Sequence, residues 1–526
     1  MSHTKAIRVY AARCIGWLGG VGIIAAVACA PGTPGIDGAP GAPPRPSSLW
    51  PVPSSARTPK PSPTPPSAPA AAAALVRDSS TAAAGSELSL TDVMDLALRN
   101  SPQTRQSWAL ARASAEDYGA SRGSLFPTIN AGVNLTQSNS TLGTTNGTSF
   151  TNTQLDSTGN VSSRSLGGLS RTQLTPTISL SYLVLDLGGR AGTIESAKQR
   201  AIAADLGHNA TVQNVVLQVE STLFSFLATR AMRNAQITAV QEAQSDTAAS
   251  EERMRVGVAT LEEVLQTRTA LAQSQFQLAT LEGNLLSARG NLAAAMGLAA
   301  NARFEIPNIG EREQICEVAA SVDTLINRAI ASRPEIAEAR AQAASLAAQV
   351  RVARSAGYPA LTLSSTASYA NSNTVNATGR NLSMVLGLQI PIFNGFSRQY
   401  DVRSAKAQYE AGLAQVTSTQ QQVTVEVFAS YAALQTSTQR IRAAEELLAS
   451  AQQSSDVAVG RYREGVGTIV DVLLARTALA NARADEIQAR WEWHTALAQL
   501  AHDAGTLDLA GRPNLPVDSS PSGIRR

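Results

Sequence analysis

The sequence repeats one structural plan twice. Ser-Pro at 101–102 recurs as Arg-Pro at 333–334, 232 residues later, whereas further along Gly257 recurs as Gly465, 208 residues later. The offset therefore changes by 24 residues, and it does so within the stretch 138–171, which is rich in Ser, Thr, Asn and Gly and is predicted to be an extended loop. A duplicated chain of this kind is expected to fold as two similar units, with the extra residues in a loop of the first unit.

Each copy contains two segments in which apolar and polar residues alternate. The apolar members are Ile129, Ala131, Val133 and Leu135, then Ile178, Leu180, Tyr182 and Val184, then Leu361 and Leu363, and finally Leu382, Met384, Leu386, Leu388, Ile390 and Ile392. A period of two is the signature of a half-buried strand. Because the opposite face is rich in Ser, Thr, Asn and Gly, the pattern also fits a barrel wall with lipid outside and water inside. Each strand has about 10 residues, which is enough for a tilted strand to cross a bilayer.

The rest of each copy is predicted to be helical. Helices of moderate length are expected at about 90–122 and 323–356, long helices at about 192–254 and 399–462, and returning helices from about 260 and 468. The long segments contain no proline, so each can extend for roughly 90 Å. The first returning helix has an apolar residue every seven positions, which predicts a coiled-coil seam. The seam residues are Val264, Leu271, Leu278, Leu285 and Leu292, and their equivalents are Val472, Leu479, Glu486, Trp493 and Leu500.

These patterns predict a mainly α-helical chain with a membrane β-barrel, in which two long antiparallel coiled-coil hairpins each start from a pair of strands. The domain boundaries follow from the repeat and from composition. Residues 29–86 are predicted to be a Pro/Ala-rich linker, 87–310 the first repeat, 311–505 the second repeat, and 506–526 a flexible C-terminal tail.

Residues 1–28 are predicted to be a secretory signal peptide. Basic residues precede an apolar run from Cys14 to Ala28 that is too short to span a bilayer comfortably. The run ends in Ala-Val-Ala followed by Cys29, which fits either a general signal-peptidase site or a bacterial lipobox in which Cys29 is acylated. In both interpretations the chain leaves the cytoplasm.

Composition and motifs argue against two classes of function. The formal charge of +3 comes from the first 28 residues, so the remainder has no basic field and nucleic acid is not an expected partner. The sequence has no nucleophile elbow, no phosphate loop and no metal-ligand spacing around His208, His494 or His502. We therefore expect neither an enzyme nor a cofactor or metal site. Trp491 and Trp493 are predicted to pack between helices.

The tips of the two predicted hairpins are the most specific part of the sequence. They read Arg-Val-Gly-Val-Ala-Thr-Leu-Glu-Glu-Val at 255–264 and Tyr-Arg-Glu-Gly-Val-Gly-Thr-Ile-Val-Asp-Val-Leu at 462–473. Together with the duplication and the Gly-Gly-Arg that follows a strand at 188–190, these tips resemble the TolC family of trimeric outer-membrane efflux channels. The resemblance covers residues 87–505.

The resemblance implies a homotrimer in the bacterial outer membrane. Each protomer would give four strands to a twelve-stranded barrel, and the helices would form a periplasmic tunnel that the tips close. The implied partners are a periplasmic adaptor protein and an inner-membrane transporter. The implied docking residues are Val256, Gly257, Val258, Gly465, Val466 and Gly467. The implied gate residues are Asp471 and Tyr462, which matches an aromatic residue that ties adjacent hairpins, and Glu263 is a further gate candidate as an acid at the other tip. The family's second gate acid, one turn later, is Leu474 here, and a tip arginine of the family is replaced by Gly467.

The same residues also fit ordinary structural roles. Thr468 with Asp471, and Thr260 with Glu263, match the capping box at the start of a helix. The tip glycines can be turn residues that tolerate a positive φ. Tyr462 can simply pack within its hairpin. Capping and gating can coexist, because threefold symmetry would repeat any tip acid around an axis.

Three functions remain open from the sequence. The first is a passive, gated duct for drug efflux, and the second is the same duct used for type I protein secretion. The third is a structural coiled-coil lipoprotein on the cell surface. The duplicated pair of amphipathic strands favours a duct, since a surface stalk needs only one anchoring unit.

Overall fold

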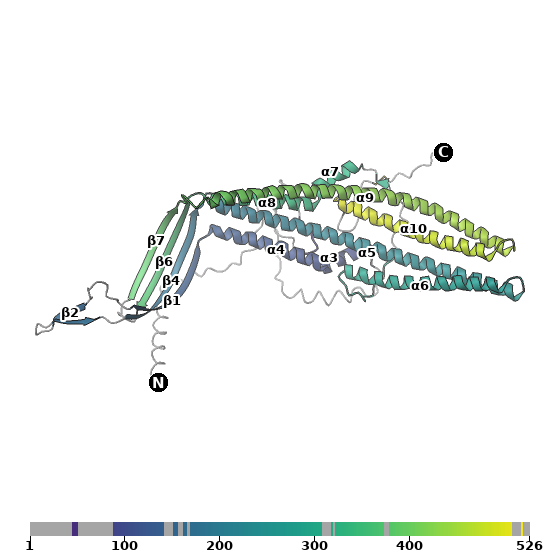
Figure 1. Cartoon of the computed structure of the whole chain (residues 1–526), viewed down its shortest axis with the longest axis horizontal. Helices are drawn as coiled ribbons and strands as arrows, with labels where there is room; N and C mark the ends of the chain where they lie inside the picture. Colours follow the sequence, from purple (N-terminus) through teal and green to yellow (C-terminus); the bar gives the residue numbers. More distant parts are fainter. Residues whose placement is uncertain are drawn as a thin grey trace, which may run out of the picture.

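The computed structural model describes residues 45–50, 88–140, 151–155, 161–165, 169–307, 317–318, 321–372, 378–507 and 517–518. The signal peptide and Cys29 lie outside these residues. The described chain forms an elongated body with a sheet at one end and two helical hairpin tips at the other (Figure 1).

Both repeats have the same order of elements, as the duplication predicts. The first contains α3 (Leu90–Asn100), α4 (Pro102–Arg122), the short helix η1 (Gly123–Leu125), β1 (Thr128–Ser140), β4 (Leu169–Leu185), α5 (Gly189–Arg255) and α6 (Leu261–Ala295). The second contains α7 (Val322–Ser332), α8 (Pro334–Ser355), β6 (Ala360–Ser372), β7 (Thr378–Gln389), α9 (Ser397–Arg463) and α10 (Ile469–Asp503).

The moderate-length helix predicted in each repeat is in fact two helices. Ser101 and Arg333 separate them, with ψ values of 124° and 129° that lie outside the helical region. The reason is the next residue, because Pro102 and Pro334 have no N–H to donate and disfavour a helical conformation before them. Each proline then occupies the first turn of the following helix, where its missing N–H costs nothing.

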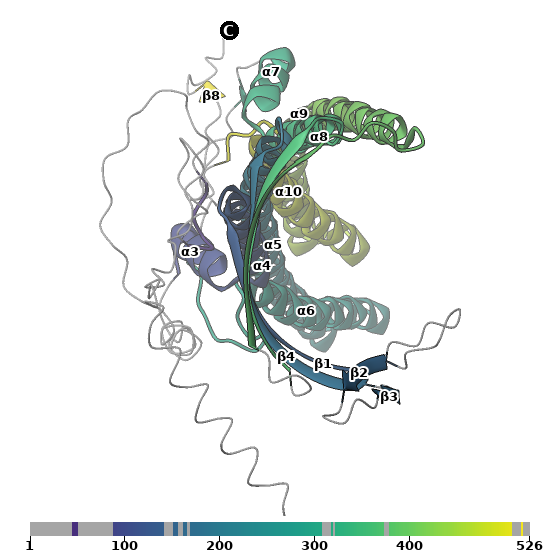
Figure 2. The same cartoon turned by 90° about the vertical axis from the view of Figure 1, so that its left-hand side faces the viewer.

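The sheet is antiparallel throughout, in the order β1-β4-β6-β7. β1 pairs with β4 along its whole length, from Thr128 opposite Ser181 to Ser140 opposite Leu169. Viewed down the long axis of the body, the sheet is a curved arc (Figure 2). β7 ends at Gln389, earlier than the alternation predicted, because Pro391 cannot take part in the ladder.

The 24 extra residues of the first repeat are not entirely a loop. They contain a second hairpin, β2 (Thr151–Leu155) paired with β3 (Val161–Ser165), beyond the end of the main sheet (Figure 1). The prediction of an extended loop was wrong for these strands. Their residues are mostly Ser, Thr, Asn and Gln, so no apolar alternation identified them.

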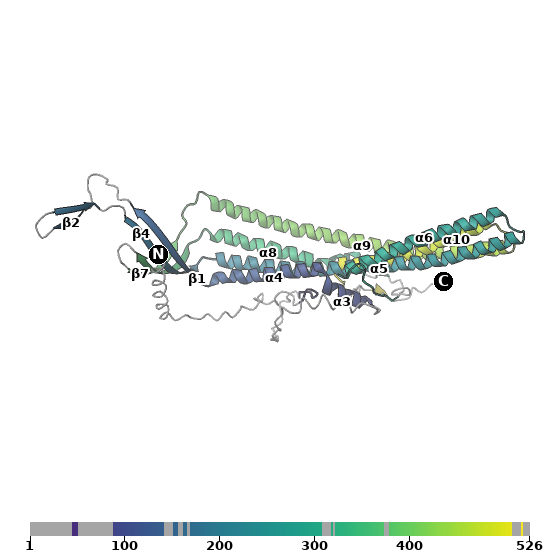
Figure 3. The same cartoon turned by 90° about the horizontal axis from the view of Figure 1, so that it is seen from below.

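The helices form a single curved layer that continues from the sheet. α5 and α9 have 67 residues each, which corresponds to about 100 Å, and they run the full length of the body. Near the sheet, α4 and α8 lie beside the two long helices. Towards the tips, α6 and α10 lie beside them instead (Figures 1 and 3). No helix of the described residues combines the length and the apolar character needed to cross a membrane.

The core lies at mid-body, where α3 and α7 cover the junctions between these helix pairs. One apolar cluster joins α3, α5 and α6 and includes Trp491, and a second joins α7, α9 and α10 and includes Trp493. The Nε1 of Trp493 donates a hydrogen bond to Oγ1 of Thr438 (3.2 Å). The predicted packing role of both tryptophans is therefore confirmed. The seam also forms, and its single polar member, Glu486, accepts a hydrogen bond from Arg490 (2.9 Å).

Both predicted loose ends contain a described segment that pairs or packs with another part of the chain. In the range predicted as a linker, Trp50 is 1% exposed and packs against α4, α5 and α8. The side-chain amide of Asn209 accepts from the backbone N–H of Trp50 (2.6 Å) and donates to its carbonyl (2.9 Å). In the range predicted as a flexible tail, β8 (Val517–Asp518) pairs with β5 (Glu317–Val318). The linker prediction did not include the Trp50 anchor, because a low-complexity composition hides a single anchoring residue.

Replacing the anchor should release the segment 45–50. We expect Trp50→Ala to cost roughly 3–5 kcal/mol of docking free energy, as the loss of a buried tryptophan does elsewhere. Hydrogen exchange of residues 45–50 should then become fast, and Asn209→Ala should have the same effect. Ser47→Ala, a partly exposed neighbour, is the control. Unchanged exchange in Trp50→Ala would show that the segment is held by something else.

Candidate gate at the hairpin tips

The first tip is a tight turn that depends on one glycine. At the end of α5, Gly257 has φ 82°, and the N–H of Val258 donates to the carbonyl of Arg253 (2.9 Å). This hydrogen bond closes the helix end with a left-handed residue, which is the usual place for glycine. A Cβ at Gly257 would meet nothing within 4 Å, so the requirement is conformational and not steric.

The second tip depends on two glycines, for two different reasons. Gly465 has φ 74° and, like Gly257, is the left-handed residue that ends its helix. Gly467 donates its N–H to the carbonyl of Arg461 (3.1 Å), and a Cβ there would lie only 3.1 Å from the Cβ of Arg461. The residue that corresponds to Gly467 in the first tip is Ala259. Gly467 therefore permits a closer turn than the one at the first tip.

The two returning helices begin with different caps. At α10, Oγ1 of Thr468 accepts from the N–H of Asp471 (3.2 Å), and Oδ2 of Asp471 accepts from the N–H of Thr468 (3.1 Å). The predicted capping box is thus confirmed for this pair, and the hydrogen bonds from the backbone and side chain of Thr468 lower the pKa of Asp471. At α6, Thr260 accepts from the N–H of Glu263 (3.3 Å), but no reciprocal bond forms. Only one of the two hydrogen bonds of the predicted capping box therefore forms at α6.

Glu263 instead belongs to a contact between the two hairpins, which we call the tip latch and define as Arg253, Glu263 and Tyr462. The hydroxyl of Tyr462 donates to Oε2 of Glu263 (3.2 Å). The guanidinium of Arg253 lies 4.5 Å from the centre of the Tyr462 ring and donates to the Tyr462 carbonyl (3.2 Å). Tyr462 is 7% exposed, and burial together with the charge of Glu263 raises its pKa. The latch fixes the end of α9 against the first hairpin.

Arg253 was not predicted. It corresponds to Arg461 in the second repeat, at the same 208-residue offset that aligns the two tip glycines. The alignment of the two repeats therefore shows an arginine four residues before each tip glycine, and this pattern could have identified Arg253 as a candidate. Only the first of them turns towards the other hairpin, and the sequence does not distinguish the two.

A group of ion pairs joins the two hairpins further from the tips than the latch. Arg476 of α10 lies 3.2 Å from Glu242 and 3.3 Å from Asp246 of α5, and Arg483 lies 3.1 Å from Glu242. These side chains are roughly one-fifth exposed, and burial raises the pKa of Asp246 despite the nearby arginine. Partly buried, hydrogen-bonded pairs of this kind hold two elements in register more effectively than exposed pairs do.

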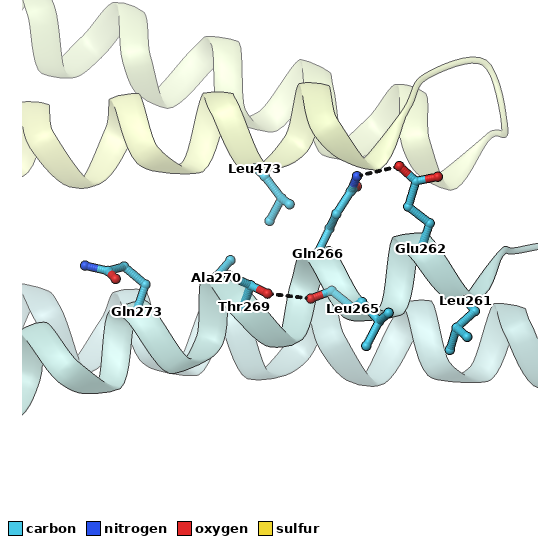
Figure 4. A pocket seen from close by; sticks show the side chains of 8 residues that line it. All are labelled: Leu261, Glu262, Leu265, Gln266, Thr269, Ala270, Gln273 and Leu473. Atoms are coloured by element: carbon cyan, nitrogen blue, oxygen red, sulfur yellow. Dashed lines mark hydrogen bonds between the residues drawn. The ribbon is translucent and has the colours of Figure 1, made fainter.

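Two grooves flank the tips. One, of 760 Å³, has Leu261 and Leu265 of α6 on one wall and Leu473 of α10 on the other, with Glu262 at its edge bonded to Gln266 (Figure 4). The other, of 430 Å³, lies between α9 and α10 and is lined by Arg461, Asp471, Leu474 and five further small or apolar residues together with Gly467. Among the described residues no group of three His, Cys, Asp or Glu side chains could hold a metal ion.

The predicted site residues thus fall into three groups. Glu263 and Tyr462 contact each other, whereas Asp471 lies on α10 and caps its helix. The six predicted docking residues lie at the two turns: Val256, Gly257, Val258, Gly465, Val466 and Gly467. Three of these are exposed valines, Val256 at 57%, Val258 at 61% and Val466 at 69%. Their roles in gating and docking stay predictions.

The sequence profile of the outer membrane efflux protein family matches residues 93–298 and 325–506, which is most of the chain. The chain belongs to this family. It is an outer-membrane channel component of a tripartite efflux or export system, with a large periplasmic portion. The family consists of channel components and is not a family of enzymes.

Individual family members are similar at low identity over most of their length. Protein CyaE of Bordetella pertussis is 24% identical over 82% of this chain and 86% of its own, and outer membrane protein TolC of Escherichia coli is 24% identical over 83% and 87%. The pyoverdine export outer membrane protein OpmQ of Pseudomonas aeruginosa is 28% identical over 64% and 69%. The CmeC channel of Campylobacter jejuni has the same fold, with a TM-score of 0.66, 19% identity and coverage of 79% and 85%.

The tip latch should control how easily the channel opens. Tyr462→Phe removes the hydrogen bond to Glu263, and a bond of this kind contributes roughly 1 kcal/mol. The ratio of open to closed channels should therefore rise about fivefold, and further in the double variant Arg253→Ala/Tyr462→Phe. Single-channel recording in a planar bilayer measures this ratio.

The matched control is Arg255→Ala. Arg255 is two residues from Arg253, but it is 72% exposed, and its one ion pair among the described residues is with Glu252 of its own helix. We expect this variant to conduct like the wild type. If it opens the channel as much as the latch variants do, then the tip responds to any loss of charge and the latch has no specific role.

Proposed function

We propose that three copies of this chain close into one duct, a twelve-stranded barrel continued by a helical tunnel, through which small toxic compounds leave the cell. An inner-membrane transporter and a periplasmic adaptor deliver these compounds to the tips. One observation carries the proposal. Among the described strands, nothing pairs with the two long outer edges of the four-stranded sheet.

The edges are β1, with 13 residues, and β7, with 12 residues. Each pairs on one side only, with β4 and β6 respectively, and no other described strand lies against its outer side. An unpaired backbone group costs several kcal/mol in hydrocarbon, so an open edge is not tolerated within a membrane. A second and a third copy remove every open edge, since β1 of one protomer can pair with β7 of the next.

The polarity of the two faces of the sheet is the one that the wall of a membrane barrel requires. On one face, a continuous row across the four strands consists of Asn130, Ser179, Thr366 and Ser383, which are consecutive partners in the register. The other face carries exposed apolar side chains. They include Val133 at 68%, Leu135 at 71%, Leu382 at 78% and Met384 at 72%. A lipid-facing apolar side and a water-facing polar side are the two surfaces of a membrane barrel that conducts polar solutes.

The tips fit the role of a docking end. The exposed valines of the two turns stand at the far end of the body from the sheet (Figure 1), on turns that internal hydrogen bonds keep rigid. Exposed apolar side chains on a rigid support are favourable for binding another protein, because little conformational entropy is lost on association. A periplasmic adaptor is the partner that this end of the duct would meet.

Small compounds are the substrate class that we favour. The description of the family is outer membrane efflux protein, and the name of its member OpmQ refers to the export of pyoverdine. Type I protein secretion uses the same architecture and is the alternative. In either use the duct is passive, and the energy comes from the inner-membrane transporter.

A deletion strain tests the proposal when it is scored for both toxicant sensitivity and the proteins missing from the medium. We expect increased sensitivity to small toxic compounds, which the wild-type gene reverses, and an unchanged set of secreted proteins. Loss of a secreted protein without a change in sensitivity would support the alternative. No change in either would contradict the proposal.

Two neighbouring substitutions in β1 provide a matched control for the barrel itself. Val133→Arg places a charge on the apolar face, where it should cost about 2–4 kcal/mol at the membrane centre. Asn134→Arg places the same charge on the polar face. We expect the first variant to fail in complementation and the second to succeed. Equal behaviour of the two would contradict the assignment of the faces.

A further inference from the structure

A third groove lies on the middle part of the long helices, away from the two grooves at the tips. It has a volume of 550 Å³ and is formed by α5, α9 and α10. Its lining combines two aromatic side chains, Phe224 and Trp491, with one carboxylate, Glu492, and with several small or polar side chains. We call it the mid-body groove. None of the residues predicted for gating or docking lines it.

The mid-body groove lies on the side of the helical layer that α3 and α7 do not cover. On α5, Val219 and Leu223 pack in the apolar cluster that includes α3. Ser221 and Ser225 line the groove, and a separation of two residues corresponds to about 200° around a helix, so they lie on the opposite face. The residues of α10 in the α7 cluster and those in the groove have the same relation.

The position of this side in the arc shows where the groove opens. α3 and α7 lie on the outer side of the arc, so the groove opens on the concave side, where α10 lies (Figure 2). In the closed duct of the proposed function, on which this inference rests, the concave side is the wall of the tunnel. A compound that moves along the tunnel therefore passes the groove.

Two aromatic rings give the groove an apolar floor. The ring centres of Phe224 and Trp491 are 6.0 Å apart, and each lies 5.4 Å from the centre of the His494 ring. Trp491 is 6% exposed and belongs to the mid-body core, whereas Phe224 is only partly buried. Because their neighbours already hold these rings in place, a flat aromatic ligand can pack against them with little loss of conformational entropy in the protein.

The polar part of the lining is a surface of hydrogen-bond acceptors. Nε2 of Gln488 donates to Oε1 of Glu492 (2.7 Å), and Nε2 of Gln499 donates to Oδ1 of Asp503 (2.9 Å). Each amide thus turns its donor towards a carboxylate, which leaves its carbonyl oxygen to accept from a ligand. Glu492 is the one charged residue of the lining. The groove is therefore complementary to a ligand with N–H donors and a positive charge, and unfavourable for an anion.

The charge of Glu492 remains accessible to such a ligand. Its ion-pair partner, Arg440 of α9, lies outside the lining and has a side chain that is 55% exposed. Water screens an ion pair that is exposed to this extent, so the carboxylate can accept from a second cation at little cost.

The three residues that define this chemistry have no counterparts of the same kind in the other repeat. At the 208-residue offset, Phe224, Trp491 and Glu492 are replaced by Ala432, Gly283 and Asn284. The replacements offer neither an aromatic surface nor a charge. The duplicated helices therefore do not need these side chains at both equivalent places, and the combination is specific to the mid-body groove.

We propose that the mid-body groove is a binding site on the tunnel wall for flat aromatic compounds that carry a cationic amine. The ring of the compound packs against Phe224 and Trp491, and its N–H groups face Glu492 and the amide oxygens of Gln488 and Gln499. A groove that is open to the tunnel binds more weakly than an enclosed pocket, as a compound in transit requires, because it must also leave. The site narrows the substrate class of the duct from small toxic compounds to aromatic amines.

Binding of ethidium, a flat aromatic cation, to the purified full-length protein in detergent tests the site. Fluorescence anisotropy measures it, with detergent alone as the blank. We expect Glu492→Gln to weaken binding about fivefold, because it removes the negative charge. Phe224→Leu should weaken binding by a similar factor, because it removes the ring but keeps an apolar side chain in the wall. Naphthalene-2-sulfonate, an aromatic anion, should not bind to the wild type.

Each variant has a matched control. Asp485→Asn removes an exposed acid that lies seven residues from Glu492 on α10, outside the lining. Phe428→Leu removes the ring of a phenylalanine of α9 that is 60% exposed and also lies outside the lining. Both controls should bind ethidium like the wild type.

A thiol placed in the groove tests whether the groove is open in the assembled protein. Thr495 lines the groove, and the variant Thr495→Cys should react at this position with a water-soluble maleimide. Peptide-resolved mass spectrometry locates the label. Saturating ethidium should slow this reaction severalfold.

Three results would overturn the proposal. The first is ethidium binding that does not exceed the detergent blank, or that is equal in the wild type, Glu492→Gln and Phe224→Leu. The second is equal binding of the aromatic anion. The third is an unreactive thiol in assembled Thr495→Cys, which would mean that another segment of chain fills the groove. If ethidium binds as expected but the deletion strain keeps its resistance to toxic compounds, then the proposed function fails while the binding site stands.

Discussion

The unpaired edges of the curved sheet are the constraint on which the rest of the architecture depends. β1 and β7 expose rows of backbone donors and acceptors beside a face of exposed Leu, Val and Met side chains. A membrane tolerates such a face only when the edges are closed. Closure by identical copies requires each protomer to be one curved layer, which the long helices continue, with the short helices α3 and α7 on its outer side (Figure 2). The open sheet and the single layer of long helices thus have the same cause, which is that both are completed only when identical copies close around them.

Duplication provides the two hairpins, and the differences between the copies provide the asymmetry that a gate needs. The first hairpin packs along α10 through the ion pairs of Glu242 and Asp246, and its tip receives Tyr462 in the latch. The second hairpin has the tighter turn at Gly467. The proposed gate can open by separating the hairpins at the latch while the mid-body core remains packed, because none of the latch residues Arg253, Glu263 and Tyr462 belongs to the two mid-body clusters.

Much of this could be predicted from sequence, and the exceptions have physical reasons. The strands and long helices followed from alternation and from the absence of proline, and they agree within a few residues. The breaks at Pro102 and Pro334 were missed because apolar periodicity continues across them. Trp50 and the β2–β3 hairpin were missed because polar or low-complexity segments carry no periodic signal. The resemblance implied that Tyr462 ties adjacent hairpins, but its partner Glu263 was missed. A capping motif and a contact between hairpins use the same carboxylate, and only geometry decides between them.

Residue-resolved hydrogen exchange of β1 and β7 in the detergent-solubilised protein tests the closed duct most directly. In an edge strand, alternate backbone N–H groups point away from the partner and exchange quickly. If β1 of one protomer pairs with β7 of the next, both alternating sets of N–H groups in both strands should exchange as slowly as those of β4 and β6, which already have partners on both sides. Fast exchange of every second N–H in β1 and β7 would contradict the account, because it would mean that the edges remain open.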